Sequence, residues 1–278
     1  MAAAALITQT GAAMAVGLFG EVGALGAVFL RLALAAAVLC VVVRPSPGLV
    51  TRANMGVVLG FGVALGAMNM LIYQAIARLP LGVAVTIELL GPLLSVVLSR
   101  RPAGVVWALL ALAGVVLLSG AGPGTGAPDP VGVLFALAAA GMWALYIMMS
   151  RQAGRSFEGI RGLALAMVIG AVLAAPFGIG SGGAALLHPR VLLVGLAVAL
   201  MSSAVPYALE LLALRRLPAE TFSILVSLAP AVAALVGWVI LGQAMGPVEV
   251  GGMALVILAS VGAVRSGRPP AASRPPLG

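Results

Sequence analysis

The sequence from Leu79 to Arg101 reads LPLGVAVTIELLGPLLSVVLSRR, and it contains most of the features on which the fold depends. It is apolar over about 20 residues, the length that an α-helix needs to cross the hydrocarbon core of a bilayer. Two arginines close it, and basic residues at the end of a span indicate its cytoplasmic side. A single carboxylate, Glu88, interrupts the apolar run, with Gly91 and Pro92 one turn further on. The stretch therefore predicts a spanning helix that contains a charge and a kink.

The composition of the whole chain agrees with a membrane protein. The sequence is 63% hydrophobic and 8% charged, whereas soluble domains contain about 25% charged residues. The net charge of +8 comes from arginines that lie singly or in pairs between apolar runs, which argues against a nucleic-acid-binding surface. One cysteine, Cys40, excludes an intrachain disulfide. The N-terminus lacks a positive region, so we expect a first span there rather than a cleaved signal.

Ten segments of spanning length appear when the sequence is cut at charges and at Pro/Gly turns. The predicted fold class is an all-α polytopic membrane protein with ten transmembrane helices. The expected spans are about residues 2–20, 24–43, 54–73, 81–99, 103–120, 131–149, 160–178, 191–213, 219–241 and 247–264.

Two five-helix units are predicted within this series, 1–120 and 131–264, joined by a Gly/Pro-rich loop at 121–130. The Pro-rich segment 265–278 is expected to be a disordered cytoplasmic tail.

The arginines predict the orientation of the chain. If the N-terminus is cytoplasmic, the inner loops and tail contain twelve of the 15 basic residues, the outer loops contain Arg78 and Arg190, and Arg31 lies within a span. The positive-inside rule favours this arrangement. The absence of Lys, together with abundant Ala and Gly, is typical of GC-rich bacterial coding. We therefore expect a bacterial inner-membrane protein with both termini in the cytoplasm.

The opening stretch also has a counterpart in the second unit. RLPLGVAVTIELLGP (78–92) aligns without gaps on RLPAETFSILVSLAP (216–230), at an offset of 138 residues and with five identical positions. Because each unit has an odd number of spans, the two repeats must be inverted in the membrane. Inverted repeats are typical of secondary transporters, whose substrate sites lie near the midplane where the repeats meet.

Three motifs give the chain a resemblance to a known family: LPLGVAVTIELLGPL (79–93), GMWALYIMMSRQAG (141–154) and SSAVPYALELLALRRLPAETFSILVSLAPAVAALVG (202–237). With the five-plus-five division, they resemble the EamA-type branch of the drug/metabolite transporter superfamily, and within it the amino-acid exporters of the bacterial inner membrane. The resemblance implies a basket of ten helices, in which spans one, three, four, six, eight and nine surround a central cavity and spans five and ten lie at the periphery.

Charged residues inside the membrane are functional candidates because burying them is costly. At about 1.5 Å of rise per residue, Arg31 and Glu88 lie at nearly the same depth, roughly 20 and 18 Å above the inner surface. They are predicted to pair, directly or through water, although Arg31 reaching outward is an alternative. Glu210 lies near the inner surface, where pairing with Arg215 or Arg216 and a role as a gate or proton site are both possible.

Polar and aromatic residues recur in the spans that would surround the cavity. An amide such as Asn69 offers both donors and an acceptor to a zwitterion, whereas single hydroxyls also serve as contacts between helices. The predicted substrate-binding residues are Gln9, Asn69, Tyr73, Glu88, Trp143, Tyr146, Ser202, Tyr207 and Ser223. Proline removes a backbone hydrogen bond and bends a helix, so kinks are predicted at Pro92, Pro206 and Pro230.

No enzyme or ATPase motif is present. The sequence lacks a G-x-x-x-x-G-K-[ST] loop and contains no Lys to complete one. The only histidine, His188, has no nearby partners for a metal, and neither a metal nor a cofactor is expected. The favoured function is a secondary transporter that exports amino acids or related small metabolites by alternating access, with or without proton coupling. The alternatives are an uncoupled facilitator and a membrane scaffold or lipid-handling protein; the oligomeric state is open.

Overall fold

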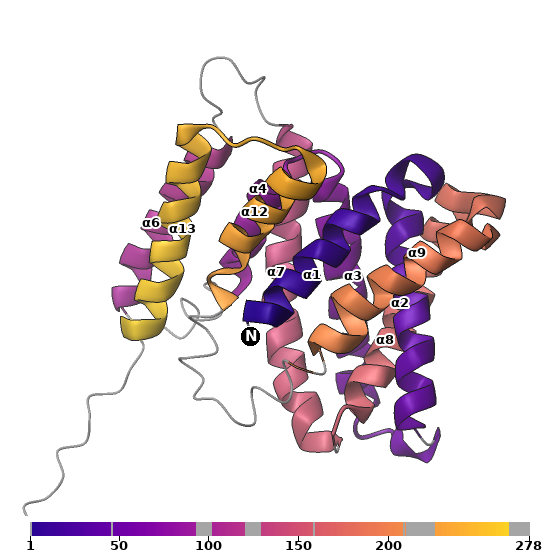
Figure 1. Ribbon diagram of the computed structural model, residues 1–278. Helices are drawn as coiled ribbons and strands as arrows, with labels where there is room; N and C mark the ends of the chain where they lie inside the picture. The colour runs from indigo at the N-terminus through magenta and orange to yellow at the C-terminus, as the bar shows by residue number, and fades with distance from the viewer. Residues whose placement is uncertain are drawn as a thin grey trace, which may run out of the picture.

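The computed structural model describes residues 2–45, 47–92, 102–119, 129–157, 159–207, 209 and 226–266. These residues are helical apart from short connections (Figure 1). The predicted positions Glu210 and Ser223, most of the 121–130 loop and most of the 265–278 tail lie outside the described residues.

The described helices each correspond to one predicted span, although the helix of the fourth span ends at Glu88 and that of the ninth span begins at Ala229. They are α1 (Ala2–Val16), α2 (Phe19–Val43), α3 (Met55–Ile76), α4 (Leu81–Glu88), α6 (Pro102–Ser119), α7 (Pro130–Ser156), α8 (Arg161–Gly182), α9 (Pro189–Ala199), α12 (Ala229–Leu241) and α13 (Pro247–Ser266). Short turns lie at Pro47–Leu49, Gly183–Leu187 and Leu200–Ala204. Prolines begin α6, α7, α9 and α13. Proline is tolerated there because the first N–H groups of a helix have no carbonyl partner within the helix.

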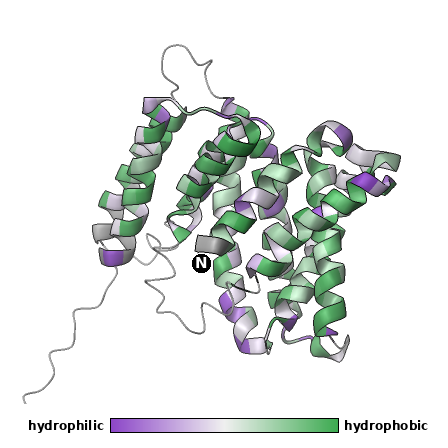
Figure 2. Ribbon diagram, viewed as in Figure 1, coloured by the Kyte–Doolittle hydropathy of each residue, from purple (hydrophilic) through white to green (hydrophobic). Residues whose placement is uncertain are grey.

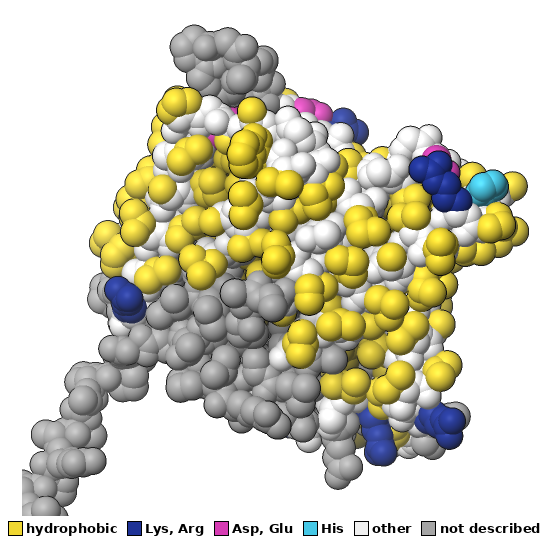
Figure 3. All heavy atoms as spheres, viewed as in Figure 1, with side chains coloured by type: hydrophobic (Ala, Val, Ile, Leu, Met, Phe, Trp, Pro, Cys, Tyr) yellow, Lys and Arg dark blue, Asp and Glu magenta, His cyan; other side chains and the backbone are white. Residues whose placement is uncertain are grey.

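The described helices have the length and surface of membrane spans. Five are long and apolar enough to cross a bilayer, and five shorter segments are also apolar helices. Large hydrophobic side chains such as Val41, Leu193 and Val239 are exposed, which a soluble monomer rarely shows over a wide surface. Apolar colouring runs along the helices (Figure 2), and hydrophobic side chains are spread over the described part of the face in Figure 3. The chain is therefore an all-helical membrane protein in the part that the structure describes.

Helices from both halves of the chain pack against one another. Extensive contacts join α2 with α8 and α3 with both α7 and α8, while α4 lies against α7 and α12. The two helices α6 and α13 pack mainly on each other at one edge of the molecule (Figure 1). The resemblance predicted this peripheral position for the fifth and tenth spans.

Small residues bring α3 and α8 into close contact. A Cβ atom at Gly66 would lie 2.8 Å from the Cα of Gly170 and 3.1 Å from its carbonyl oxygen. Glycines at such crossings let two helix backbones approach, which is a common source of stability between membrane helices. Gly66 therefore fixes the distance between one helix of each half.

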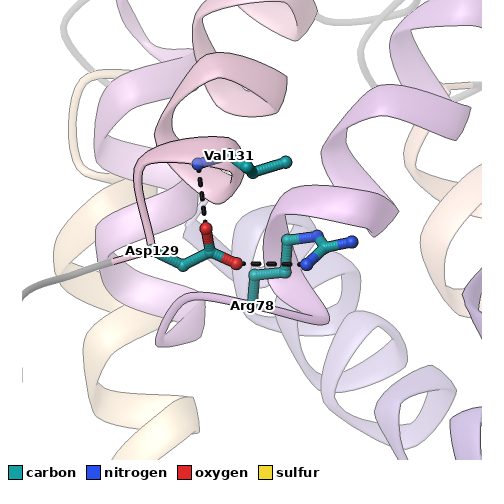
Figure 4. Close-up of polar contacts among 3 residues, drawn as sticks. All are labelled: Arg78, Asp129 and Val131. Carbon is teal, nitrogen blue, oxygen red and sulfur yellow. Dashed lines mark hydrogen bonds and ion pairs between the residues drawn. The ribbon is translucent and has the colours of Figure 1, made fainter.

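Three polar contacts tie the halves together on the side that the arginines predict to be outer. Arg78, after α3, forms a 3.1 Å ion pair with Asp129, whose other oxygen accepts the Val131 N–H at 2.9 Å and caps α7 (Figure 4). The Leu81 N–H at the start of α4 donates to Oε1 of Gln243 at 2.9 Å. Glu21 and Arg190 lie 3.5 Å apart.

Interruptions occur within several helices. The fourth span has a turn at Leu89 and continues to Pro92, the last described residue there, and the ninth has a turn at Ser227 and Leu228 before α12 begins. These two interruptions are separated by the same 138 positions as the sequence repeat. Pro230 lies in the first turn of α12. A π-helical turn, Leu200–Ala204, directly precedes the segment that contains Pro206.

Candidate functional site

A cavity of about 150 Å³ lies between the two halves. Its wall comes from α1, α2, α3, α4 and α7, from the π-helical turn with the residues after it, and from the start of α12. The lining residues are Ala4, Ala5, Thr8, Gln9, Ala12, Arg31, Met68, Asn69, Ile72, Tyr73, Ile76, Val85, Glu88, Trp143, Tyr146, Ser202, Pro206, Tyr207, Val226 and Ala229. The wall thus combines a mostly apolar surface with a few polar groups, as small-molecule sites do.

The structure brings most of the predicted site residues together in this wall. Those that line it are Gln9, Arg31, Asn69, Tyr73, Glu88, Trp143, Tyr146, Ser202, Pro206 and Tyr207. Pro92 and Pro230 lie in described helices but outside the lining. Substrate binding by the lining residues stays a prediction, as does any role of Glu210 and Ser223.

Arg31 is the best-anchored polar group of the cavity. Its Nε donates to the Ser203 hydroxyl at 2.8 Å, Nη1 to the Tyr73 hydroxyl at 3.3 Å and Nη2 to the Ser202 carbonyl at 2.7 Å. The guanidinium carbon also lies 5.4 Å from the centre of the Tyr73 ring, within the range of a cation–π contact. With 6% of its surface exposed, Arg31 points into the protein, and the alternative of an outward-reaching side chain does not hold.

Proline at position 206 explains why the Ser202 carbonyl is available. A helical residue donates its N–H to the carbonyl four positions earlier, but Pro206 has no N–H to offer Ser202. The backbone adapts through a π-helical turn, in which the Val205 N–H donates to the carbonyl of Leu200. The freed carbonyl then accepts a hydrogen bond from Arg31, so the helix irregularity and the buried cation satisfy each other.

Glu88, the last residue of α4, lies in the wall of the same cavity. No ion pair joins its carboxylate to Arg31, although both residues are described; the guanidinium is bound by the groups named above instead. The predicted direct pair is therefore not formed in this structure. A bridge through water between the two charges stays a prediction.

Other polar groups of the wall are partly occupied by local hydrogen bonds. The Asn69 Nδ2 donates to the Leu65 carbonyl of its own helix at 2.8 Å, which leaves its carbonyl oxygen and one N–H for another partner. The Ser202 hydroxyl donates to the Thr8 carbonyl at 3.0 Å and joins the π-helical turn to α1. This hydroxyl acts as a contact between helices, which was one of the two roles that the sequence allowed.

Aromatic rings form one side of the cavity. The rings of Tyr146 and Tyr207 lie 6.1 Å apart between centres, and Phe61 packs behind Tyr146 at 5.2 Å. Trp143 lines the cavity together with them. These rings give rigid apolar surface close to the two charges.

Sequence reasoning did not find the anchoring of Arg31. The role of the Ser202 backbone and of Ser203 depends on a contact between α2 and the π-helical turn, which lie about 170 positions apart in the chain. One signal was present: Pro206 frees the carbonyl of the residue four positions before it. The apolar lining residues Met68, Ile72 and Val85 carry no such signal.

The fold and the cavity define a class, that of polytopic membrane transporters with a small cavity between two helical halves. The chain belongs to the EamA-like transporter family, whose model matches residues 130–265. It is 40% identical to the threonine/homoserine exporter RhtA of Escherichia coli (strain K12), over 91% of this chain and 86% of that protein. It is 38% identical to the exporter of the same name from Salmonella typhimurium (strain LT2), over the same shares.

A solved structure supports the fold. A protein crystal structure with 22% sequence identity superimposes with a TM-score of 0.64 and covers 94% of this chain and 93% of its own. The family and the fold confirm the resemblance that the three motifs indicated.

Proposed function

We propose that the protein exports threonine, homoserine and similar small amino acids across the bacterial inner membrane. The observation that carries the proposal is the 40% identity to threonine/homoserine exporters over 91% of the chain. The charged, small cavity adds independent support because it suits a small polar molecule better than a lipid chain. The buried cation Arg31 in the cavity wall also favours a solute-binding protein over a membrane scaffold, because burying a charge is costly and a scaffold binds no solute that would compensate it.

The proposed architecture is a ten-span bundle of two inverted five-helix repeats, 1–120 and 131–264, with both termini in the cytoplasm. The matched interruptions at Leu89 and Ser227 support the repeat, since they have the same offset as the sequence alignment. The surplus of arginine in one set of loops supports the orientation.

Alternating access is the proposed transport mechanism. The contacts Arg78–Asp129 and Leu81–Gln243 connect the halves on the side assigned as outer, which supports a conformation closed on that side. Release outward then requires these contacts to separate, while the interrupted fourth and ninth spans bend around the cavity. Such movement of one repeat against the other is common in transporters built from inverted repeats.

The proposal predicts export in living cells. A bacterium that produces the protein should excrete more threonine and homoserine than the same strain producing an Arg31→Gln variant at equal membrane abundance. Equal excretion by the two strains, with both proteins folded, would contradict export through this cavity.

Proton coupling is a separate question with its own measurement. Uptake into proteoliposomes is compared with and without an imposed pH gradient. Antiport predicts accumulation above the external concentration only when the gradient is present, and Glu88 and Glu210 are the proposed proton carriers. Equilibration without accumulation in both conditions would favour the facilitator.

A further inference from the structure

No described carboxylate forms an ion pair or hydrogen bond with Arg31, although Glu88 lies in the wall of the same cavity. The three hydrogen bonds of Arg31 go to two hydroxyls and one backbone carbonyl, all of them neutral. A guanidinium has five N–H donors, so two remain after these bonds. A buried charge is costly unless a counter-charge compensates it, and guanidinium N–H groups form strong hydrogen bonds with carboxylates.

Glu88 is in the complementary situation. It has no hydrogen bond or ion pair with any described residue, and it lines the same cavity as Arg31. A carboxylate in such a wall favours a cation with several donors, and an ammonium group provides three. The wall of the cavity therefore contains one basic and one acidic side chain.

We propose that Arg31 and Glu88 together bind the zwitterionic end of an α-amino acid, Arg31 its carboxylate and Glu88 its ammonium group. This inference rests on the proposed function and specifies how the same cavity selects its substrate. Pro206, through the Ser202 carbonyl, acts as a positioning residue that holds the guanidinium in place.

The size of the cavity agrees with this arrangement. A cavity of about 150 Å³ accepts a molecule about as large as benzene, and threonine is only slightly larger. The carboxylate and the ammonium of an α-amino acid are attached to the same carbon, so two opposite charges in the wall of one small cavity can both be reached. Met68, Ile72, Ile76 and Val85 form apolar surface for the rest of the molecule.

This proposed pair of binding groups, Arg31 and Glu88, forms a clamp. The clamp predicts that a ligand needs both a carboxylate and an ammonium group to bind tightly. Hydrogen bonds to charged groups contribute about 1.5–3 kcal/mol, which corresponds to a loss of about ten- to a hundredfold in affinity when one charge is removed. Threoninamide lacks the carboxylate charge, and 2,3-dihydroxybutanoate lacks the ammonium. Each should bind at least tenfold more weakly than threonine.

The experiment measures binding by the rise in the Tm of the purified full-length protein, since a ligand that binds the folded state stabilises it. Threonine, threoninamide and 2,3-dihydroxybutanoate are titrated against the wild-type protein, Arg31→Gln, Arg31→Lys and Glu88→Gln. Arg161→Gln and Glu249→Gln remove the same charges outside the cavity and serve as matched controls.

Each cavity variant should lose one preference only. Arg31→Gln should bind threonine and threoninamide with affinities within about threefold of each other, and it should still bind 2,3-dihydroxybutanoate weakly. Glu88→Gln should bind threonine and 2,3-dihydroxybutanoate with affinities within about threefold of each other, and it should still bind threoninamide weakly. Arg31→Lys retains the charge, so it reports on the same site if Arg31→Gln does not fold. The controls should keep the wild-type ranking.

The outcomes separate the clamp from the function. If the wild-type protein binds both analogues as tightly as threonine, or if both cavity variants keep the wild-type ranking, the clamp is refuted and amino-acid export stands. If wild-type protein binds no small amino acid, the proposed function is refuted and the clamp with it.

Discussion

Ser203→Ala tests whether the hydrogen bonds at Arg31 stabilise the fold. Ser203 is fully buried, and its hydroxyl lies 2.8 Å from Nε of Arg31. The substitution removes the acceptor and leaves a charged N–H without a partner in the protein. A hydrogen bond to a charged group contributes about 1.5–3 kcal/mol, so we expect a loss of that size in the free energy of unfolding.

Tyr73→Phe provides the graded comparison. Its hydroxyl lies 3.3 Å from Nη1, beyond the usual range of about 2.7–3.2 Å for a good N–H···O bond. The variant keeps the ring over the guanidinium. The expected loss is about 0.5–1.5 kcal/mol, the contribution of an ordinary hydrogen bond.

The assay is thermal unfolding in detergent, followed by intrinsic tryptophan fluorescence, with Ser150→Ala as the control. The Ser150 hydroxyl donates only to the Ile147 carbonyl of its own helix, and its loss should change stability by less than about 0.5 kcal/mol. Ser203→Ala should lower the Tm by several degrees and Tyr73→Phe by less. A Tm for Ser203→Ala equal to that of Ser150→Ala would refute the reasoning, as would a larger effect of Tyr73→Phe.

Three further predictions concern other parts of the molecule. Gly66→Ala should lower the free energy of unfolding by about 1–3 kcal/mol in thermal unfolding, because the added methyl group meets the backbone of α8. The control Gly56→Ala should leave stability unchanged, because a methyl group there meets nothing within 4 Å. Equal effects of the two substitutions would contradict the close crossing of α3 and α8. The Val131 N–H first, and Arg78 second, hold the pKa of Asp129 below its usual range. The stabilisation of the fold by the ionised Asp129 side chain is therefore complete above the ordinary aspartate pKa, and it is lost as the pH falls through the lower pKa of the folded protein. Acid should thus reduce the Tm of the wild-type protein more than that of Asp129→Asn. Parallel falls in the Tm of the two proteins would argue against this role of Asp129. Pro206→Ala restores an N–H that competes for the Ser202 carbonyl, so threonine affinity, measured by thermal shift, should fall about two- to tenfold without loss of stability; unchanged affinity would remove Pro206 as a positioning residue.

The helices were predictable because their signals are local. Apolar length, prolines at helix starts and arginines between spans are each contained in a short window of sequence. The second span was expected to begin at residue 24, and the structure has a positive φ of 71° at Gly23, where the helix is interrupted. The freed Val22 carbonyl accepts the Ser181 hydroxyl at 2.9 Å.

The composition of the cavity was also partly predictable, since polar residues in apolar spans are few. Their mutual geometry was not predictable, because it depends on which side of each helix is turned towards its neighbours. Arg31 and Glu88 lie at similar predicted depths, which favoured a direct pair. The structure instead gives Arg31 three partners, two of them from a π-helical turn that lies about 170 positions further along the chain. Depth along a helix can be counted from sequence, but the rotation of the helix about its axis cannot.

The most direct test of the proposed function is counterflow in proteoliposomes. Vesicles that contain the purified protein are loaded with unlabelled threonine and diluted into labelled threonine. We expect a transient accumulation of label that saturates with concentration and is reduced by homoserine and by the Arg31→Gln substitution. Label at the level of protein-free vesicles, from a preparation that unfolds cooperatively and is therefore folded, would contradict amino-acid transport by this protein.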